Sequence, residues 1–75
     1  MLMCIVDKLD PSANSKRAWI NLDKITMIED YSFVIFKNKQ DITIDATKII
    51  FDDKSFIIVK DFELKHLTTV YDKEN

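Results

Sequence analysis

The residues best suited to acid–base or nucleophilic chemistry are few in this sequence. The chain holds one histidine, His66, and one cysteine, Cys4, and it has no glycine. No serine or cysteine stands near His66 in a recognisable nucleophile motif, and an oxyanion turn of the usual kind needs glycine. We therefore interpret His66 as a surface or edge-strand residue. Cys4 lies in the apolar run MLMCIV, so we predict a small buried hydrophobe rather than a reactive thiolate.

Carboxylates occur in two adjacent pairs, Glu29–Asp30 and Asp52–Asp53. Glycosidase chemistry needs two carboxylates on either side of a cleft. Asp52–Asp53 is better explained by turn formation, and Glu29–Asp30 by the end of a strand. Phosphate-binding loops require glycine, and one His with one Cys forms no metal motif. The sequence predicts no enzyme, no cofactor, no metal and no small-molecule substrate.

The segment SKRAW is the one feature suited to an acidic partner. Lys16 and Arg17 are placed to meet phosphate while Trp19 stacks on a base. However, 11 basic and 13 acidic residues give a net charge of −2, which is not the basic footprint of a nucleic-acid binder. A single Trp more often belongs to a core or an interface. We keep Lys16, Arg17 and Trp19 as candidate partner contacts, because an exposed Trp beside Arg is a typical protein-binding hot spot.

The length of 75 residues allows one domain, which we place at residues 1–71, with a disordered tail at 72–75. A chain this short buries a limited core, and its single cysteine excludes an internal disulfide. Oligomerisation remains as a source of support. The opening apolar run is too short for a signal peptide or a membrane span, so we expect a cytoplasmic protein without membrane contact. Abundant Ile, Lys, Asp and Asn suggest a bacterial or phage origin.

The hydrophobic pattern is that of β-strands over most of the chain. Residues 2–6 and 17–22 are predicted strands, separated by a loop at 7–16 that contains the only proline. Asn21 to Lys24 predicts a tight bend, and the break in alternation at Ile28 predicts a bulge near Met27.

The segment SFVIFKNKQDITID is the clearest hairpin. A turn at Asn38–Lys39 pairs Ile35 with Ile42 and Phe33 with Ile44. One face then carries Phe33, Ile35, Ile42 and Ile44, which we expect to be buried, and the other carries Val34, Phe36, Asp41 and Thr43.

The segment KIIFDDKSFIIV has apolar residues on both sides of a polar centre. A turn at Asp53–Lys54 pairs Phe51 with Phe56 and Ile50 with Ile57, which leaves both faces apolar. Strands of this kind are covered on two sides. We therefore predict a homodimer or protein-partner interface at Ile49, Ile50, Phe51, Phe56, Ile57, Ile58 and Val59. The alternative is a helical turn at residues 46–51.

The end of the chain, residues 62–71, is read as strand, with a helix as the alternative. The predicted fold is therefore mainly β: a small antiparallel sheet or partial barrel of about five to six strands, or an α+β variant with one short helical segment.

Residues Ile20 to Asp45 resemble the opening of LytTR-type DNA-binding domains, and also that of small FlbD-type flagellar proteins. The positions in register with that pattern are Ile20, Leu22, Asp23, Ile25, Ile28 and Glu29. The resemblance covers about a third of the chain and implies a small β fold. The later basic segment that contacts DNA in LytTR-type domains has no counterpart around Ser55 to His66, so no binding residue is carried over.

Two functions follow as expectations. The first is a non-enzymatic interaction or regulatory protein, an accessory protein that acts through protein–protein contacts and self-association. The alternative is a DNA-binding transcriptional regulator with a LytTR-like fold, which the absence of a basic footprint disfavours.

Overall fold

The computed structural model describes residues 2–60, residue 62 and residues 71–72. Five strands form one open antiparallel sheet, in the order β2-β1-β5-β4-β3, and a short β6 pairs with β1. This confirms the predicted mainly β fold. The elements are β1 (Leu2–Leu9), β2 (Ser15–Asn21), a 3₁₀ turn η1 (Leu22–Lys24), β3 (Ile25–Lys37), β4 (Gln40–Phe51), β5 (Phe56–Val59) and β6 (Tyr71–Asp72).

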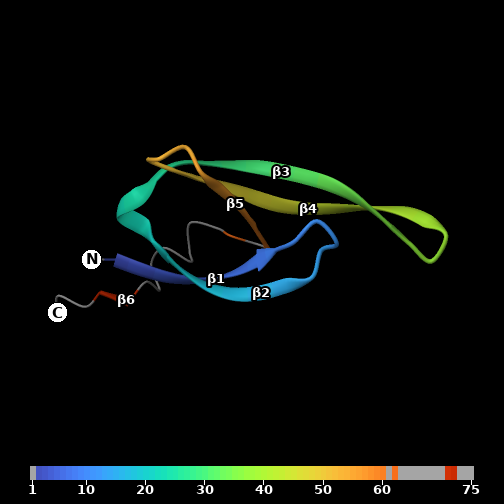
Figure 1. The fold of residues 1–75 in the computed structure, drawn as a ribbon, viewed down its shortest axis with the longest axis horizontal. Helices are drawn as coiled ribbons and strands as arrows, with labels where there is room; N and C mark the ends of the chain where they lie inside the picture. Colours follow the sequence, from blue (N-terminus) through green and yellow to red (C-terminus); the bar gives the residue numbers. More distant parts are fainter. Residues whose placement is uncertain (1, 61, 63–70, 73–75) are drawn as a thin grey trace.

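The sheet is folded into two layers that β5 connects. The β3–β4 hairpin forms one layer and the β1–β2 hairpin the other, and β5 crosses between them (Figure 1). β5 pairs with β4 from Thr47 to Ile50, and with β1 only at Lys8. The longest dimension is 50 Å, because the β3–β4 hairpin extends past the β1–β2 turn (Figure 1). We call this extension, residues 32–45, the arm.

The core lies between the layers and is small. Ile49 and Val59 are completely buried, and they contact Cys4, Val6 and Ile20 from the β1–β2 layer. Phe62 completes this cluster, and the Thr47 hydroxyl donates a hydrogen bond of 3.4 Å to its carbonyl oxygen. Cys4 is thus the buried hydrophobe that its apolar surroundings predicted.

The first strands are longer than expected and the loop between them is shorter. β1 continues to Leu9 and β2 begins at Ser15, because Asp10 holds a compact turn. Its carboxylate accepts hydrogen bonds from the backbone N–H groups of Ser12 and Asn14, and its carbonyl accepts one from Ala13. The expected loop over residues 7–16 is therefore wrong at both ends.

The bend and the bulge before the arm are confirmed. The Asn21 side chain accepts a hydrogen bond from the Asp23 N–H and caps η1, which turns the chain from β2 into β3. The β3–β4 register then shifts between Ile25 and Met27. The arm has the predicted register, with Phe33 opposite Ile44 and a turn at Asn38 and Lys39, both of which have positive φ.

The second hairpin is wrong by one residue. Ile50 lies opposite Phe56 and Ile49 opposite Ile57, where we had predicted Phe51–Phe56 and Ile50–Ile57 pairs. The loop holds three residues, 52–54, and Lys54 has φ 70°. The N–H of Phe51 bonds to the carbonyl of Ser55, which closes the loop. This is a type I turn followed by a left-handed residue, a common alternative to the two-residue turn.

Residues 46–51 belong to β4, so the helical alternative for that segment is wrong. The strand expected at 62–71 lies largely outside the described residues, as do His66 and residues 73–75 of the expected tail. Tyr71 and Asp72 form β6.

Candidate functional site

The acidic groups that the sequence offered for chemistry do not converge. Glu29 and Asp30 are consecutive strand residues and therefore project to opposite faces of the sheet. The Asp53 carboxylate is used within its turn, where it accepts hydrogen bonds from the N–H and hydroxyl of Ser55, and these bonds lower its pKa. The Asp52 carboxylate forms an ion pair with Lys24, with 3.7 Å between Oδ2 and Nζ. Among the described residues no group of three or more His, Cys, Asp and Glu is placed to bind a metal.

The Cys4 thiol is also unsuited to nucleophilic chemistry. It is buried in the core, and burial raises its pKa above the ordinary value of 9.0. A protonated, inaccessible thiol is a poor nucleophile.

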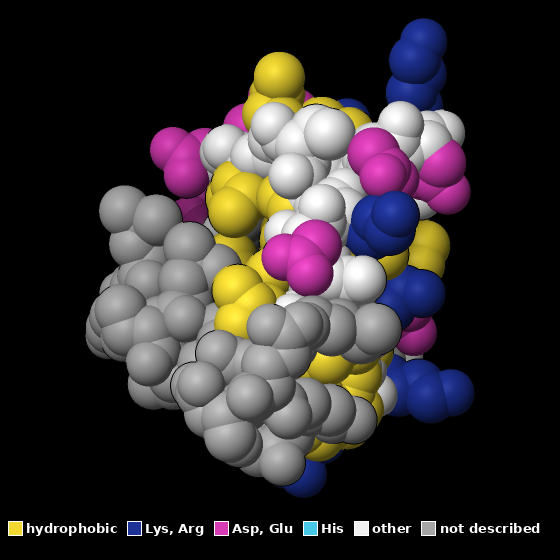
Figure 2. Space-filling view, turned by 90° about the vertical axis from the view of Figure 1, so that its left-hand side faces the viewer, with side chains coloured by type: hydrophobic (Ala, Val, Ile, Leu, Met, Phe, Trp, Pro, Cys, Tyr) yellow, Lys and Arg dark blue, Asp and Glu magenta, His cyan; other side chains and the backbone are white. Residues whose placement is uncertain are grey.

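The candidate partner contacts on β2 do not form one cluster. Arg17 lies opposite Asp7 and Trp19 opposite Ile5, so both project from the same face. Lys16 lies opposite Lys8 and projects from the other face. Trp19 is 56% exposed, so its side chain is not part of the core. Charges of both signs are also visible on the end of the molecule shown in Figure 2, with hydrophobic side chains exposed between them.

The candidate interface on β4 and β5 is divided between two faces. Ile49, Val59, Ile57 and Phe51 turn toward the core or pack against it. The other three residues, Ile50, Phe56 and Ile58, project from the opposite side of the same strands, since directly paired residues share a face. Phe56 is 54% exposed.

This second side, which we call the open face, continues along the arm. The pairing places a series of mostly apolar side chains on it: Met27, Glu29, Tyr31, Phe33, Ile35 and Lys37 from β3, Ile42, Ile44, Ala46, Lys48 and Ile50 from β4, and Phe56 and Ile58 from β5. Phe33, Ile35, Ile42 and Ile44 are the set that we expected to be buried, and they are only half-buried. The described core packs against the opposite face of β4, the face that carries Ile49, and beyond Thr47 β4 pairs only with β3 among the described strands.

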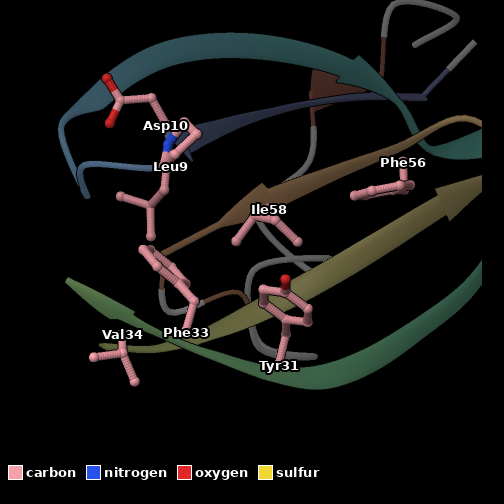
Figure 3. Close-up of a pocket in the computed structure, with 8 residues that line it drawn as sticks. Leu9, Asp10, Tyr31, Phe33, Val34, Phe56 and Ile58 are labelled. Atoms are coloured by element: carbon pink, nitrogen blue, oxygen red, sulfur yellow. The ribbon is translucent and has the colours of Figure 1, made fainter. Parts of the chain in front are cut away.

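A groove of about 370 Å³ lies at the centre of the open face, near the lower end of the range of about 300–1,000 Å³ typical of ligand pockets. Leu9, Asp10 and Pro11 form one wall, and Tyr31, Phe33, Phe56 and Ile58 form most of the remainder. Figure 3 shows Leu9 and Phe33 pointing toward one another, with Ile58 and Tyr31 beside them. Val34 also borders the groove but extends from the opposite side of β3 (Figure 3).

The wall made by Leu9 and Pro11 was missed by the sequence reasoning. Both residues had been placed in a long loop, whereas the turn at Asp10 brings them against the arm. The signal available was Asp10 itself, an acidic residue preceding Pro, Ser and Asn, which is typical of a compact side-chain-capped turn.

Lys48 is a cation within the apolar part of the open face. Its Nζ lies 4.3 Å from the centroid of the Phe56 ring and 5.9 Å from that of Tyr31. The same nitrogen lies 4.0 Å from Glu29. Its hydrocarbon stem therefore adds to the apolar surface, while its charge is held by two rings and a carboxylate.

The comparisons with protein families, with curated proteins and with solved structures found no match. The resemblance to LytTR-type domains accordingly stays a prediction from the residues. In the described part of the chain, no helix has the length and apolar character needed to span a membrane.

Proposed function

We propose that this protein is a non-enzymatic interaction protein that holds an apolar segment of a partner protein on its open face. The observation that supports the proposal is the groove between Leu9 and the arm, set within a continuous apolar surface on β3, β4 and β5. Exposed apolar surfaces of this kind mark interaction sites when they are contiguous. Tyr31, Phe33 and Phe56 are aromatic anchors of the type found at protein interfaces.

The polar groups around the groove favour a protein segment over a small polar ligand. A small-molecule site orients its ligand with a few free polar groups. Here the Asp10 carboxylate already accepts two backbone hydrogen bonds, and Lys48 is engaged by Glu29 and the rings. Affinity at this site therefore comes mainly from apolar burial, on the order of 25 cal/mol per Å² before the costs of association are subtracted.

We further propose that the protein works in the cytoplasm as a bacterial or phage accessory protein. This part rests on composition: one cysteine, no glycine, and abundant Ile, Lys, Asp and Asn.

The experiment that tests the site compares two neighbouring residues of β4 that face opposite ways. Ile44 is on the open face and Thr43 on the other. A partner captured from cells with the natural chain is purified, and its affinity is measured against Ile44→Asp and Thr43→Asp. We expect Ile44→Asp to weaken binding at least about 30-fold, since it places a charge in an apolar contact, and Thr43→Asp to retain it. Equal affinities for the two variants would contradict the proposal, provided both show native circular dichroism.

The DNA-binding alternative keeps one supporting observation, the exposure of Arg17 and Trp19 on the same face of β2. Lys16 projects from the other face, and the net charge of −2 offers little attraction to phosphate. Retardation of a mixed-sequence duplex at low salt tests this function. A shift that Arg17→Glu abolishes would favour DNA binding over the open-face proposal.

A further inference from the structure

The outer edge of β3 is unpaired in the described sheet, where β3 is the last strand. It spans 13 residues, which is long for an edge strand. The Asn38–Lys39 turn sets its hydrogen-bonding phase, because a two-residue loop is closed by a hydrogen-bonded pair, here Lys37 and Gln40. Alternation from that pair turns the backbone N–H and C=O groups of residues 30, 32, 34 and 36 outward.

The described edges of the sheet differ in charge. The only charged residues of β2 are basic, Lys16 and Arg17. In the part of β4 that β5 leaves unpaired, residues 41–46, the only charged residues are acidic, Asp41 and Asp45. When either edge pairs with the same edge of a second copy, its charged residues face like charges or face no opposite charge. Both arrangements disfavour pairing. β3 alone carries both signs, with Glu29 and Asp30 consecutive in the strand and Lys37 at its end.

We infer that two copies of this chain pair through β3, antiparallel, with Phe33 on the twofold axis. In this register Glu29 lies opposite Lys37 of the second copy, and symmetry gives that ion pair twice. Tyr31 lies opposite Ile35 of the second copy, and Phe33 opposite itself. These are non-hydrogen-bonded pairs, in which the Cα atoms approach to about 4.5 Å and the side chains are closest. The outward groups of residues 30, 32, 34 and 36 form the ladder.

Other registers lose the charge match. Centring the axis on Ser32 places Glu29 opposite Ile35, and centring it on Val34 places Lys37 opposite Tyr31. Centring it on Asp30 brings two carboxylates together. Moving the axis by one residue shifts the register of the two strands by two residues, which keeps each set of side chains on its own face. These registers are therefore the relevant competitors.

The inference goes beyond the proposed function, because the edge of β3 makes the contact and the open face stays accessible. Tyr31, Phe33 and Ile35 project from the open face along β3. Pairing through β3 therefore joins the open faces of two copies into one surface. A partner with two apolar segments would then bind both.

The first test is a charge exchange followed by solution mass. Light scattering across a concentration series should show a monomer–dimer equilibrium for the natural chain. Glu29→Lys should weaken it about tenfold, from two repulsive pairs. Adding Lys37→Glu should restore it, although the Glu29–Lys48 contact is absent in both variants. Lys39→Glu, in the turn just outside the paired residues, is the matched control and should leave the dimer unchanged.

The second test locates the axis. In a Cys4→Ala background, Phe33→Cys should form an intermolecular disulfide under mild oxidation, since facing Cα atoms lie within the about 4.4–6.8 Å that a disulfide needs. Tyr31→Cys alone should not, because its copies are about 13 Å apart along the strand. Tyr31→Cys mixed with Ile35→Cys should cross-link.

Three results would overturn the inference: a monomer at every concentration, a mass that rises without limit as β2 edges pair with β4 edges, or a failure of the charge exchange to restore the dimer. The proposed function is judged separately. Ile44→Asp should dimerise normally and lose the partner, whereas Glu29→Lys should retain partner binding to each single copy.

Discussion

At the scale of single residues, Asp53 is the group whose ionisation is most closely tied to local structure. Its carboxylate accepts hydrogen bonds from the N–H and hydroxyl of Ser55, and the first of these bonds measures 2.9 Å. Both bonds are stronger to the ionised form, so the pKa of Asp53 in the folded chain lies below its ordinary value of 3.8. The turn between β4 and β5 is therefore held in part by a charge.

This arrangement predicts a pH dependence of stability. A lowered folded-state pKa means that the stabilising contribution is complete above the unfolded-state pKa and is lost as the pH falls through the folded-state pKa. Between about pH 5 and pH 2, the free energy of unfolding of the natural chain should fall more than that of Asp53→Asn. Urea denaturation over this range measures the difference. Ser55→Ala should give an intermediate slope, and identical slopes for all three proteins would contradict the assignment.

Trp19 illustrates a limit of reasoning from one residue type. A lone tryptophan predicted a core or interface residue, and the 56% exposure of Trp19 excludes only the core. The cause lies in its neighbours: Ala18 and Ile20 of the same strand turn toward the core, so Trp19 turns away from it. Strand alternation, which was visible in the sequence, decides the orientation more firmly than the size of the side chain.

At the scale of elements, the arm turn is made of two residues that adopt positive φ, 54° at Asn38 and 63° at Lys39. Asn tolerates this region, whereas a lysine there costs roughly 1–2 kcal/mol. Lys39→Gly creates the Asn-Gly pair preferred in this turn type. We expect it to raise the free energy of unfolding by about 1 kcal/mol, measured by urea denaturation.

The control for this change is Lys37→Gly, two residues earlier and within β3. Glycine in a strand interior loses conformational entropy on folding, so this variant should be destabilised by about 0.5–1 kcal/mol. If both substitutions destabilise the chain, the left-handed conformation of Lys39 is wrong.

The two hairpins show how far turn chemistry can be predicted without glycine. The arm turn was predicted correctly, because Asn38 marked the position where φ becomes positive. The β4–β5 loop was wrong by one residue, because the left-handed position is occupied by Lys54. Lysine carries no signal for that conformation, and Asp52–Asp53–Lys54 is equally compatible with a two- or three-residue loop.

At the scale of the whole molecule, the one-residue difference in the β4–β5 register determines which side chains of each strand face the core. A register shift of one residue changes which side chains share a face. With the predicted pairing, Ile50 and Ile57 would lie on the same face. With the observed pairing, Ile57 joins Ile49 against the core, and Ile50 joins Phe56 on the open face. The sequence predicted two apolar faces correctly, and it could not predict which residues formed each one.

The open face as a whole was equally hard to predict. The sequence identified the Phe33, Ile35, Ile42 and Ile44 set but placed it inside the molecule. Whether a face of a strand pair is covered depends on which face the other layer packs against, and the β1–β2 layer contacts Ile49 on the core face of β4, which makes the difference between the covered and the open face. No local pattern in the arm records that difference, because it arises from contacts between distant parts of the chain.

The two-faced arrangement predicts opposite outcomes for the same substitution at consecutive positions. Ile49 is completely buried, so Ile49→Asp places an unpaired charge in the core, a cost of several kcal/mol. A small domain is stabilised by only about 5–15 kcal/mol, and a core this limited belongs at the low end. Ile49→Asp should therefore unfold the chain, which far-UV circular dichroism would detect.

Ile50→Asp should instead remain folded, because Ile50 is partly exposed on the open face and the introduced carboxylate can reach water. Its dimer, measured by light scattering, should be unchanged, because Ile50 is on β4 and the inferred contact is on β3. Its affinity for an open-face partner should fall. If Ile50→Asp unfolds as completely as Ile49→Asp, the face is closed by the protein itself and is not a binding surface. The contrast between these adjacent residues thus separates a core from an interface with one kind of substitution.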